Sequence, residues 1–344
     1  VCFPDEKIFL SVNPSTQPAG TKYGNCDPHI IELDINNSLP KMRPIRPIWD
    51  EGIYFTDHSY RGISADGKRK EILLLNINAQ TSEQFWSLYE NGKWTRYGRI
   101  SFPIRSCYPQ VALKDHSAHV LAIGDIVEPV DEWRNYKFKK TGSGWDYVFR
   151  RLFYTWTPDI TKSDFAEPIE VDNLEKTAGH ITNLDLWIDD DGKAHILYLK
   201  RTVQSNLMRD KFFPDVPINV SLEYVIIAKG KVENSITLIM GGESASSEVP
   251  GYARFHVTKD GKLFVIYYCN DKDSNENTIS ENRLMQILPK LSEKPQKLNF
   301  KEPFGVLFTA IERSGTLPSN TIDIFGSSFG NSLRYARIGL KPVK

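Results

Sequence analysis

The chain has 344 residues, in which 43 basic residues balance 43 acidic ones and charged residues make up 25% of the total. This composition is typical of a globular protein, and the lack of a basic excess argues against a nucleic-acid platform. No apolar run approaches the roughly 18 residues that a membrane-spanning helix needs, which excludes an integral membrane protein. An enzyme, a binding module and a scaffold are the classes left open.

The chain begins at Val1-Cys2-Phe3, with neither a charged nor an apolar leader segment. We expect a mature or trimmed chain from which a targeting segment has been removed. Four scattered cysteines are too few for a disulfide-based scaffold. A Cys2–Cys26 disulfide and a fully reduced set both remain open.

Four segments of the chain resemble one another: 60–76, 108–125, 183–200 and 252–270, with a weaker fifth copy at 304–327. Each has an apolar-rich strand, a turn, and a second strand rich in Ile, Val, Leu and Tyr. Most turns contain Asp-Gly, a strong hairpin signal because glycine readily adopts positive φ. The turn aspartates recur about every 50 to 75 residues, the size of a four-stranded propeller blade with variable loops.

Further strands are expected where a blade needs them. Third strands are predicted at 84–89, 151–156, 222–228, 283–288 and 333–338, and short fourth strands at 96–101, 236–240 and 297–300. Strands at 7–12 and 29–35 precede the first copy, and helix should be scarce. The sequence thus predicts an all-β fold, a single β-propeller domain over residues 1–344 with five blades. Pairing of the N-terminal strands with the C-terminal blade would close the ring; six blades result if those strands form their own blade.

Long loops are predicted on one face of this propeller. Loops that leave second strands lie on the same face as the starts of first strands, and loops 125–149 and 200–220 are long and rich in charge and aromatics. Long loops on one rim of a rigid scaffold are the usual place for a binding site. The residues offered there for substrate binding are Asp125, Trp133, Arg134, Arg201 and Arg209, together with Tyr136 and Trp145.

Polar and aromatic residues also precede or begin the first strands, where they should converge on the channel mouth. They are His58, Tyr60 and Arg61, then Cys107 and Tyr108, then His180 and Asn183, and finally Tyr252 and Arg254. Such convergence from several blades is typical of a polar substrate pocket; plugging of the channel by hydrogen bonds is the alternative for any one residue.

Histidine positions separate structural from functional candidates. His119 and His195 occupy equivalent positions in two copies, which indicates a structural role. His58 and His180 instead lie where first strands begin, and a histidine titrates near neutral pH. We therefore take His58 and His180 as the preferred acid–base groups. No cofactor motif is present, so no cofactor is expected, although a divalent metal is left open.

The copies resemble BNR-type repeats of the sialidase-like propeller superfamily, through Ile63-Ser64-Ala65-Asp66-Gly67 and the segment 187–192. The complete Asp-box and the sialidase arginine triad are absent. The segment His58-Ser59-Tyr60-Arg61-Gly62 looks closer to the BNR-4 group, which includes secreted bacterial polysaccharide lyases. That resemblance implies His58 as base, Tyr60 or Tyr252 as acid, and Arg61 or Arg254 as the carboxylate clamp; the second histidine of the group is replaced by Asn76 or Asn78.

These observations predict a secreted, periplasmic or surface-anchored carbohydrate-active protein that cleaves a polysaccharide or oligosaccharide. Elimination needs a base and a cation, which His58 and Arg254 could supply. Hydrolysis needs two carboxyl groups about 5–10 Å apart, for which Asp57 and Asp125 are the best pair. Elimination is slightly favoured. The alternative is a non-catalytic propeller that binds a glycan or a protein at the same rim, and an intracellular scaffold is a third reading.

Overall fold

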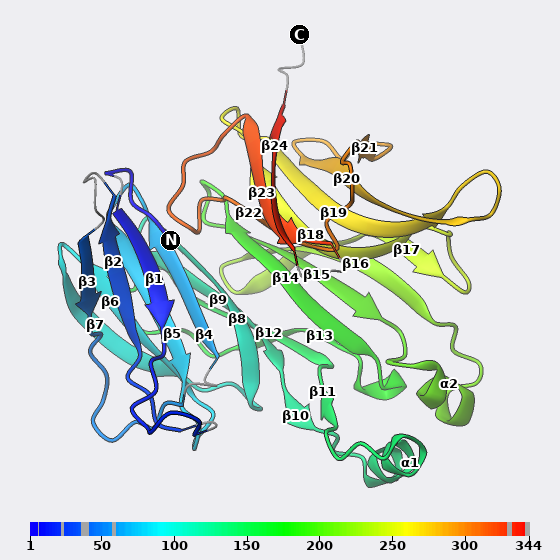
Figure 1. The fold of residues 1–344 in the computed structure, drawn as a ribbon, viewed down its shortest axis with the longest axis horizontal. Coiled ribbons are helices and arrows are strands. Elements are labelled where there is room, and N and C mark those ends of the chain that lie inside the picture. The colour runs from blue at the N-terminus through cyan, green and yellow to red at the C-terminus, as the bar shows by residue number, and fades with distance from the viewer. Residues whose placement is uncertain (6, 22–23, 36–40, 57–59, 329–331, 341–344) are drawn as a thin grey trace.

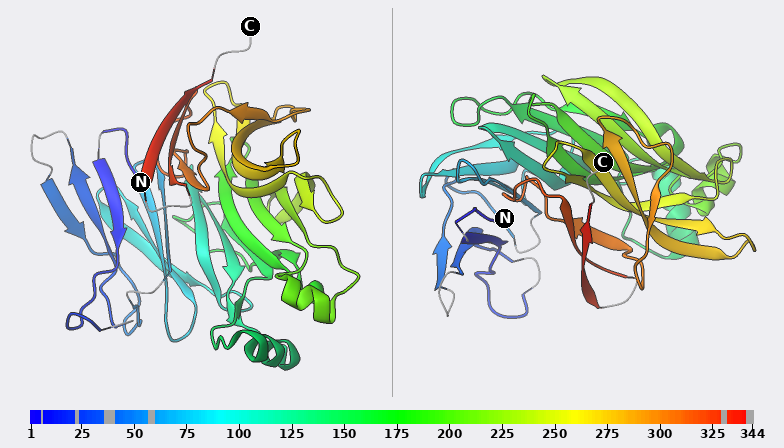
Figure 2. Two further views of the ribbon diagram at one scale, coloured as in Figure 1. Left: turned by 45° about the vertical axis from the view of Figure 1, so that its right-hand side comes forward. Right: turned by 90° about the horizontal axis from the view of Figure 1, so that it is seen from above.

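Six antiparallel sheets surround a common axis, and the protein is a six-bladed β-propeller (Figures 1 and 2). The computed structural model describes residues 1–344 except 6, 22–23, 36–40, 57–59, 329–331 and 341–344. The all-β prediction is confirmed, in its six-blade form. None of the described helices is long and apolar enough to cross a membrane.

The blades follow one another along the chain. The first has the strands β1 (Lys7–Val12), β2 (His29–Asp34) and β3 (Lys41–Ile45). The second has β4 (Arg61–Asp66), β5 (Glu71–Ile77), β6 (Gln84–Glu90) and β7 (Lys93–Ile100), and the third has β8 (Ser106–Lys114), β9 (Ser117–Gly124), β12 (Arg151–Thr157) and β13 (Ile169–Asn173).

The fourth blade has β14 (His180–Ile188), β15 (Ala194–Arg201), β16 (Asn219–Ala228) and β17 (Lys231–Gly242). The fifth has β18 (Val249–Val257), β19 (Leu263–Lys272), β20 (Thr278–Leu288) and β21 (Gln296–Leu298), and the sixth has β22 (Val306–Thr309), β23 (Thr321–Ser327) and β24 (Leu333–Gly339). The predicted third and fourth strands all lie within or overlap these strands; β3 and β13 were not predicted.

Two insertions project from one face of the ring (Figure 1). The first lies between β9 and β12 and contains β10 (Ile126–Val127), helix α1 (Asp131–Thr141) and β11 (Tyr147–Val148). The second lies between β15 and β16 and contains helix α2 (Asn206–Phe212). A 3₁₀ turn, η1 (Glu175–Thr177), precedes β14. The prediction that both long loops emerge on the same face is confirmed.

The hairpins on the opposite face form as their sequence predicts. Oδ1 of Asp66 accepts hydrogen bonds from the backbone N–H groups of Lys68 and Arg69 at 2.9 and 3.1 Å. Aspartate stabilises turns in this way because its short side chain reaches backbone donors two and three residues on. Gly192 and Gly261 each have a φ of 75°, which glycine adopts without steric cost.

Apolar clusters fill the five seams from blade 1 to blade 6. The first strands of blades 2 to 6 each contact the next around the axis, in the order β4, β8, β14, β18 and β22. Among the described residues, no apolar cluster joins blade 6 to blade 1. Five strands therefore line the axis of a ring that has six sheets, and the last seam needs a different kind of contact.

Loop 310–320, the connection between β22 and β23, makes that contact. The N–H of Cys2 donates to the carbonyl of Ser314 at 2.8 Å, and Ser64 Oγ and the N–H of Ala65 donate to the carbonyl of Arg313 at 2.8 and 2.9 Å. The predicted closure, in which N-terminal strands pair with the C-terminal blade in one sheet, is therefore corrected. Strand β3 was not predicted, because it is exposed, contains Pro44 and shows no alternation of apolar and polar residues. Its pairing with β2 gives the N-terminal strands a sheet of their own.

Replacement of Gly315 by alanine should weaken this closure. Gly315 has a φ of 87°, and an added Cβ would overlap the carbonyl oxygen of Cys2. We expect Gly315→Ala to lower the free energy of unfolding by about 2–3 kcal/mol, from backbone strain and the clash together. The control is Gly261→Ala, at a φ of 75° with open space around the new Cβ, which should cost about 1 kcal/mol. Equal losses in urea denaturation would contradict the closure.

Candidate functional site

Three of the first strands carry a β-bulge near their start. The register shifts between Cys107 and Gln110 in β8, between Asn183 and Asp185 in β14, and between Pro250 and Ala253 in β18. A bulge adds one or more unpaired residues to one strand and redirects the neighbouring side chains. The bulges recur near the starts of the first strands of blades 3, 4 and 5.

Tyr108 lies in the first of these bulges. Its φ of 52° is in the left-handed region, which is uncommon for a residue other than glycine. Its side chain is 44% exposed, and its hydroxyl lies 3.0 Å from that of Tyr60, with the two rings 4.3 Å apart. Asn183 Nδ2 donates to the carbonyl of Tyr108 at 2.7 Å. Blades 2, 3 and 4 therefore meet at this tyrosine pair.

Arg254 and Tyr252 continue the arc around the mouth. Arg254 is only 3% exposed, and its guanidinium donates to the carbonyl of Leu184 and, at 2.5 Å, to the hydroxyl of Tyr252. It stacks on the rings of Tyr252 and Phe308 at 4.5 and 5.0 Å. Burial lowers the pKa of Arg254. Arg254, one of the two arginines predicted to bind a substrate carboxylate, is thus held in the channel wall, where it joins blades 4, 5 and 6.

His180 and Arg201 form a cross-strand pair on the same rim. They lie opposite each other in the register of β14 and β15. Burial, and then the positive charges of Arg201 and Arg150, lower the pKa of His180 below its usual value. Arg201 Nε is buried without a hydrogen-bond partner in the described part of the chain. The mouth therefore holds a neutral imidazole next to a guanidinium.

Phe149 links this pair to the tyrosines. Its ring lies 5.6 Å from the ring of His180 and 5.8 Å from that of Tyr108, nearly perpendicular to both. Burial and the hydrogen bond with Tyr108 raise the pKa of Tyr60 well above its usual value. The Tyr60 hydroxyl therefore stays protonated at neutral pH.

Asp125 lies deeper, below the tyrosine pair. It is 2% exposed and forms an ion pair of 3.0 Å with Arg105 Nη1. The Arg105 guanidinium in turn lies 5.8 Å from the ring of Tyr60 and 5.7 Å from that of Tyr147. Asp125 thus acts on the mouth through Arg105, a residue in the connection between β7 and β8 that sequence reasoning missed.

Three of the predicted residues on the long loops, Trp133, Arg134 and Arg209, have their contacts within, between or beside the two insertions instead. Trp133 packs α1 against Phe212 and Phe213 of the second insertion, at 6.2 and 5.5 Å. Arg134 is exposed and pairs with Asp131 within its own helix at 2.7 Å. Arg209 pairs with Asp210 and, at 2.7 Å, with Glu243. Helical packing of the two insertions explains these positions, and the sequence lacked the periodicity to predict it.

The other predicted residues are an arginine at the start of β4 and several histidines. Arg61 begins β4, where it pairs with Asn76 in the strand register and is exposed. His58, and Asp57 with it, fall outside the described residues. His119 and His195 are buried, and their Nδ1 atoms each lie 2.6 Å from a tyrosine hydroxyl, Tyr154 and Tyr224. Their predicted structural role is confirmed.

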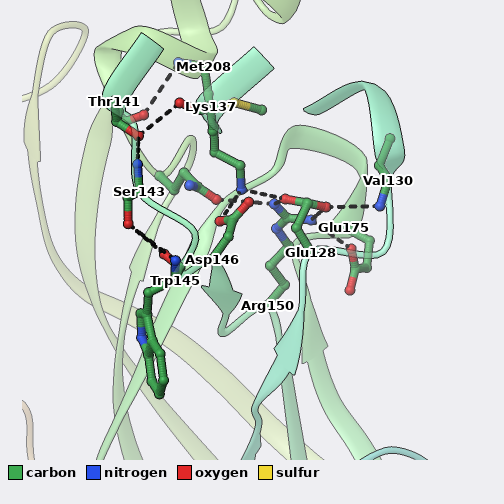
Figure 3. A network of polar contacts seen from close by, with 12 residues as sticks. Glu128, Val130, Lys137, Thr141, Ser143, Trp145, Asp146, Arg150, Glu175 and Met208 are labelled. Carbon is green, nitrogen blue, oxygen red and sulfur yellow. Dashed lines mark hydrogen bonds and ion pairs between the residues drawn. The ribbon is translucent and has the colours of Figure 1, made fainter. Parts of the chain in front are cut away.

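A buried ion network fixes the first insertion to the ring (Figure 3). Glu128 accepts from Lys137 at 2.8 Å and from both terminal nitrogens of Arg150, and Lys137 also donates to Asp146 at 2.7 Å. Burial alone would raise the pKa of Glu128, but the hydrogen bonds from Arg150 and Lys137 outweigh it and lower that pKa. The insertion is therefore a fixed part of the rim.

Known proteins resemble this chain in structure but not in sequence. No protein-family model and no curated protein matches the sequence. An alpha-L-arabinanase of Penicillium chrysogenum, solved with arabinobiose, superimposes with a TM-score of 0.51 at 11% identity, over 99% of this chain and 92% of that one. The polysaccharide lyase Uly1 gives 0.47 at 12% identity over 98% and 80% of the two chains. An alpha-L-arabinofuranosidase of Fusarium graminearum gives 0.47 at 12% identity over 99% and 91%.

These likenesses concern the fold alone, because all identities are far below 25%. The arabinanase agrees with the propeller that the structure of this chain shows. No group of three or more metal-ligating side chains occurs among the described residues.

The pKa of His180 should respond to the charge of Arg201. We expect Arg201→Gln to raise this pKa, because one of the two neighbouring cations is removed, while burial still keeps it below the usual value of about 6.5. Lys200→Gln is the control: it removes the same charge one residue away, from a side chain paired with Asp172 at 3.1 Å. NMR titration of the imidazole Cε1–H measures both. An equal shift in the two variants would contradict the pairing.

Loss of the Glu128 carboxylate should release the first insertion. Glu128→Gln leaves Lys137 and Arg150 buried without their shared counter-charge, and breaking such a pair costs about 3–5 kcal/mol. We expect faster hydrogen exchange in α1 peptides, with slower-exchanging blade strands unaffected. Asp131→Asn, which removes an exposed carboxylate from the same helix, is the control. Unchanged exchange in Glu128→Gln would show that apolar contacts alone hold the insertion.

Proposed function

We propose that the protein is a carbohydrate-active propeller that cleaves a uronate-containing polysaccharide or oligosaccharide by β-elimination at the channel mouth. The observation that carries this proposal is the cross-strand pair of a neutral His180 with Arg201, next to the Tyr60–Tyr108 pair. Resemblance to the arabinanase of Penicillium chrysogenum supports a carbohydrate ligand on this fold.

The residues match the demands of the reaction. Arg201 would bind the uronate carboxylate, which makes the proton at C5 more acidic, and neutral His180 would take that proton. The electron pair left at C5 forms the C4–C5 double bond as the C4–O bond breaks. The leaving oxygen takes a proton from a tyrosine hydroxyl, of which Tyr108 is the more exposed. Proton and electron pair are thus accounted for without a further reactant.

The other predicted groups have secondary places in this proposal. Arg254 and Tyr252 would shape the far wall of the mouth, and Asn183 would hold Tyr108 by its carbonyl. Arg61 lies at the edge, where it offers a second cation to an acidic chain. His58 remains proposed as an acid–base group from its position before Tyr60.

Hydrolysis has less support at this site. It requires two carboxyl groups flanking one bond, one to activate water or attack and one to protonate the leaving group. Asp125 is buried and paired with Arg105, and Asp57 falls outside the described residues. A cation and a neutral imidazole are what the described rim offers instead, and these suit elimination.

The remaining expectations extend the proposal. A polymeric substrate suits a secreted, periplasmic or surface-anchored protein, and we propose a BNR-type relationship on the segments 63–67 and 187–192. We also propose that residues 1–344 act as one domain, with a glycan and no nucleic acid as partner.

Cleavage can be tested directly. Polygalacturonate, alginate, hyaluronan and heparan sulfate are incubated with the protein, and the ultraviolet absorbance of the unsaturated product is followed together with reducing-end release. We expect His180→Gln to lower kcat/KM at least about 100-fold, the usual contribution of general acid–base catalysis. His116→Gln, on the opposite face, should leave it unchanged.

Each outcome selects one function. Reducing ends without ultraviolet absorbance, on these polymers or on neutral arabinan, would replace elimination by hydrolysis. Binding without either signal would identify a non-catalytic glycan-binding propeller. Full activity in His180→Gln would remove that residue from the mechanism.

A further inference from the structure

Trp145 is a tryptophan without an obvious packing role. It is 71% exposed in the first insertion, shortly before β11, and its ring lies 4.6 Å from that of Tyr147 at a tilt. In Figure 3 its side chain points away from the ion network. Trp133, in the same insertion, is instead partly buried against Phe212 and Phe213. The two tryptophans therefore serve different purposes: one packs the insertion, and the other faces solvent.

The backbone under Trp145 is held firmly. Ser143 Oγ accepts from the N–H of Trp145 at 3.3 Å and donates to its carbonyl at 3.2 Å. The next residue, Asp146, is tied to Lys137 at 2.7 Å, and its carbonyl accepts from the N–H of Glu128 at 2.9 Å. Exposed aromatic side chains on a fixed backbone lose little conformational freedom on binding, which favours a ligand site.

Arg105 joins this aromatic pair to the channel mouth. Its guanidinium lies 5.7 and 5.8 Å from the rings of Tyr147 and Tyr60, and among the described residues its hydrogen bonds go from Nη1 to Asp125. A guanidinium has five N–H donors, so others remain for a ligand. Trp145, Tyr147, Arg105, Tyr60 and Tyr108 thus form a continuous row of aromatic faces with a cation in its middle.

We propose that Trp145 and Tyr147 form a remote subsite that binds sugar units of an acidic polysaccharide several units away from the bond that is cleaved. Sugar rings present C–H faces that pack on aromatic rings, and Arg105 supplies N–H donors for a uronate carboxylate. The row gives an extended chain a path from the subsite to the tyrosine pair. This inference rests on the proposed function for its polymer, although binding can be measured without cleavage.

The test compares long and short substrates. For Trp145→Ala we expect KM on a cleaved polymer to rise about tenfold with kcat unchanged, and no change on a disaccharide or trisaccharide of the same units. Phe138→Ala is the matched control, because Phe138 is also aromatic, lies on the same insertion and is 57% exposed. Trp145→Tyr should retain most of the polymer affinity. Near-ultraviolet circular dichroism verifies that each variant is folded.

Binding is measured separately by electrophoresis in native gels that contain polygalacturonate, alginate, hyaluronan or heparan sulfate, with arabinan as the neutral polymer. Retardation that Trp145→Ala loses and Phe138→Ala keeps would support the subsite even if no polymer is cleaved, and the proposed function would then fail alone. Cleavage with equal KM in wild type and Trp145→Ala would overturn the subsite alone. Equal retardation in arabinan and in the acidic polymers would overturn the acidic substrate class.

Discussion

The buried carboxylate of Asp185 holds the centre of this ring together. It is fully buried in β14, where it accepts the backbone N–H of Phe255 in β18 at 2.9 Å and Nε of Arg313 in loop 310–320 at 3.0 Å. A buried charge is tolerated only when it is paired and hydrogen-bonded, so these donors are tied to their places. Because the same loop contacts blades 1 and 2, one carboxylate connects the middle of the chain to both of its ends.

This arrangement explains how a ring can close without a shared sheet. Propellers gain stability from apolar seams between blades, and here five seams have them. At the sixth, polar contacts of Arg313 and Ser314 replace apolar packing. Trp187 Nε1 adds a hydrogen bond to Glu312 at 2.6 Å from blade 4. The loop is thus held from several blades, and the mouth on the other face keeps a fixed shape.

The sequence predicts the regular part of this fold well. Asp-Gly turns and β-rich segments repeat along the chain, and these local signals are sufficient to place most strands. The closure was missed because Ser314-Gly315 looks like another hairpin turn, whereas β22 ends at Thr309 and β23 begins only at Thr321. What extends the loop is contact with Asp185 and Cys2, which lie far away in the sequence. Local patterns cannot show such contacts.

The candidate site, too, could be predicted from the sequence only in part. The starts of first strands could be aligned from sequence, and Tyr60, Tyr108, Asn183, Tyr252 and Arg254 do lie along one arc. The depth of each side chain could not be predicted, because it depends on bulges and on neighbouring blades. Arg254 enters the wall, while Tyr108 remains exposed. Arg105 and Phe149 escaped notice because they lie in connections whose path only the fold determines.

The chemistry of the mouth depends on how charge is divided across it. Arg150 is paired with Glu128, and Arg105 with Asp125, so two of the cations near the rim already have buried partners. Arg201 has no ion-pair partner among the described residues, and the imidazole beside it stays neutral because protonation would add a second positive charge in a poorly solvated place. In the elimination proposed above, an anionic substrate would supply the missing counter-charge of Arg201, while burial keeps lowering the pKa of the imidazole.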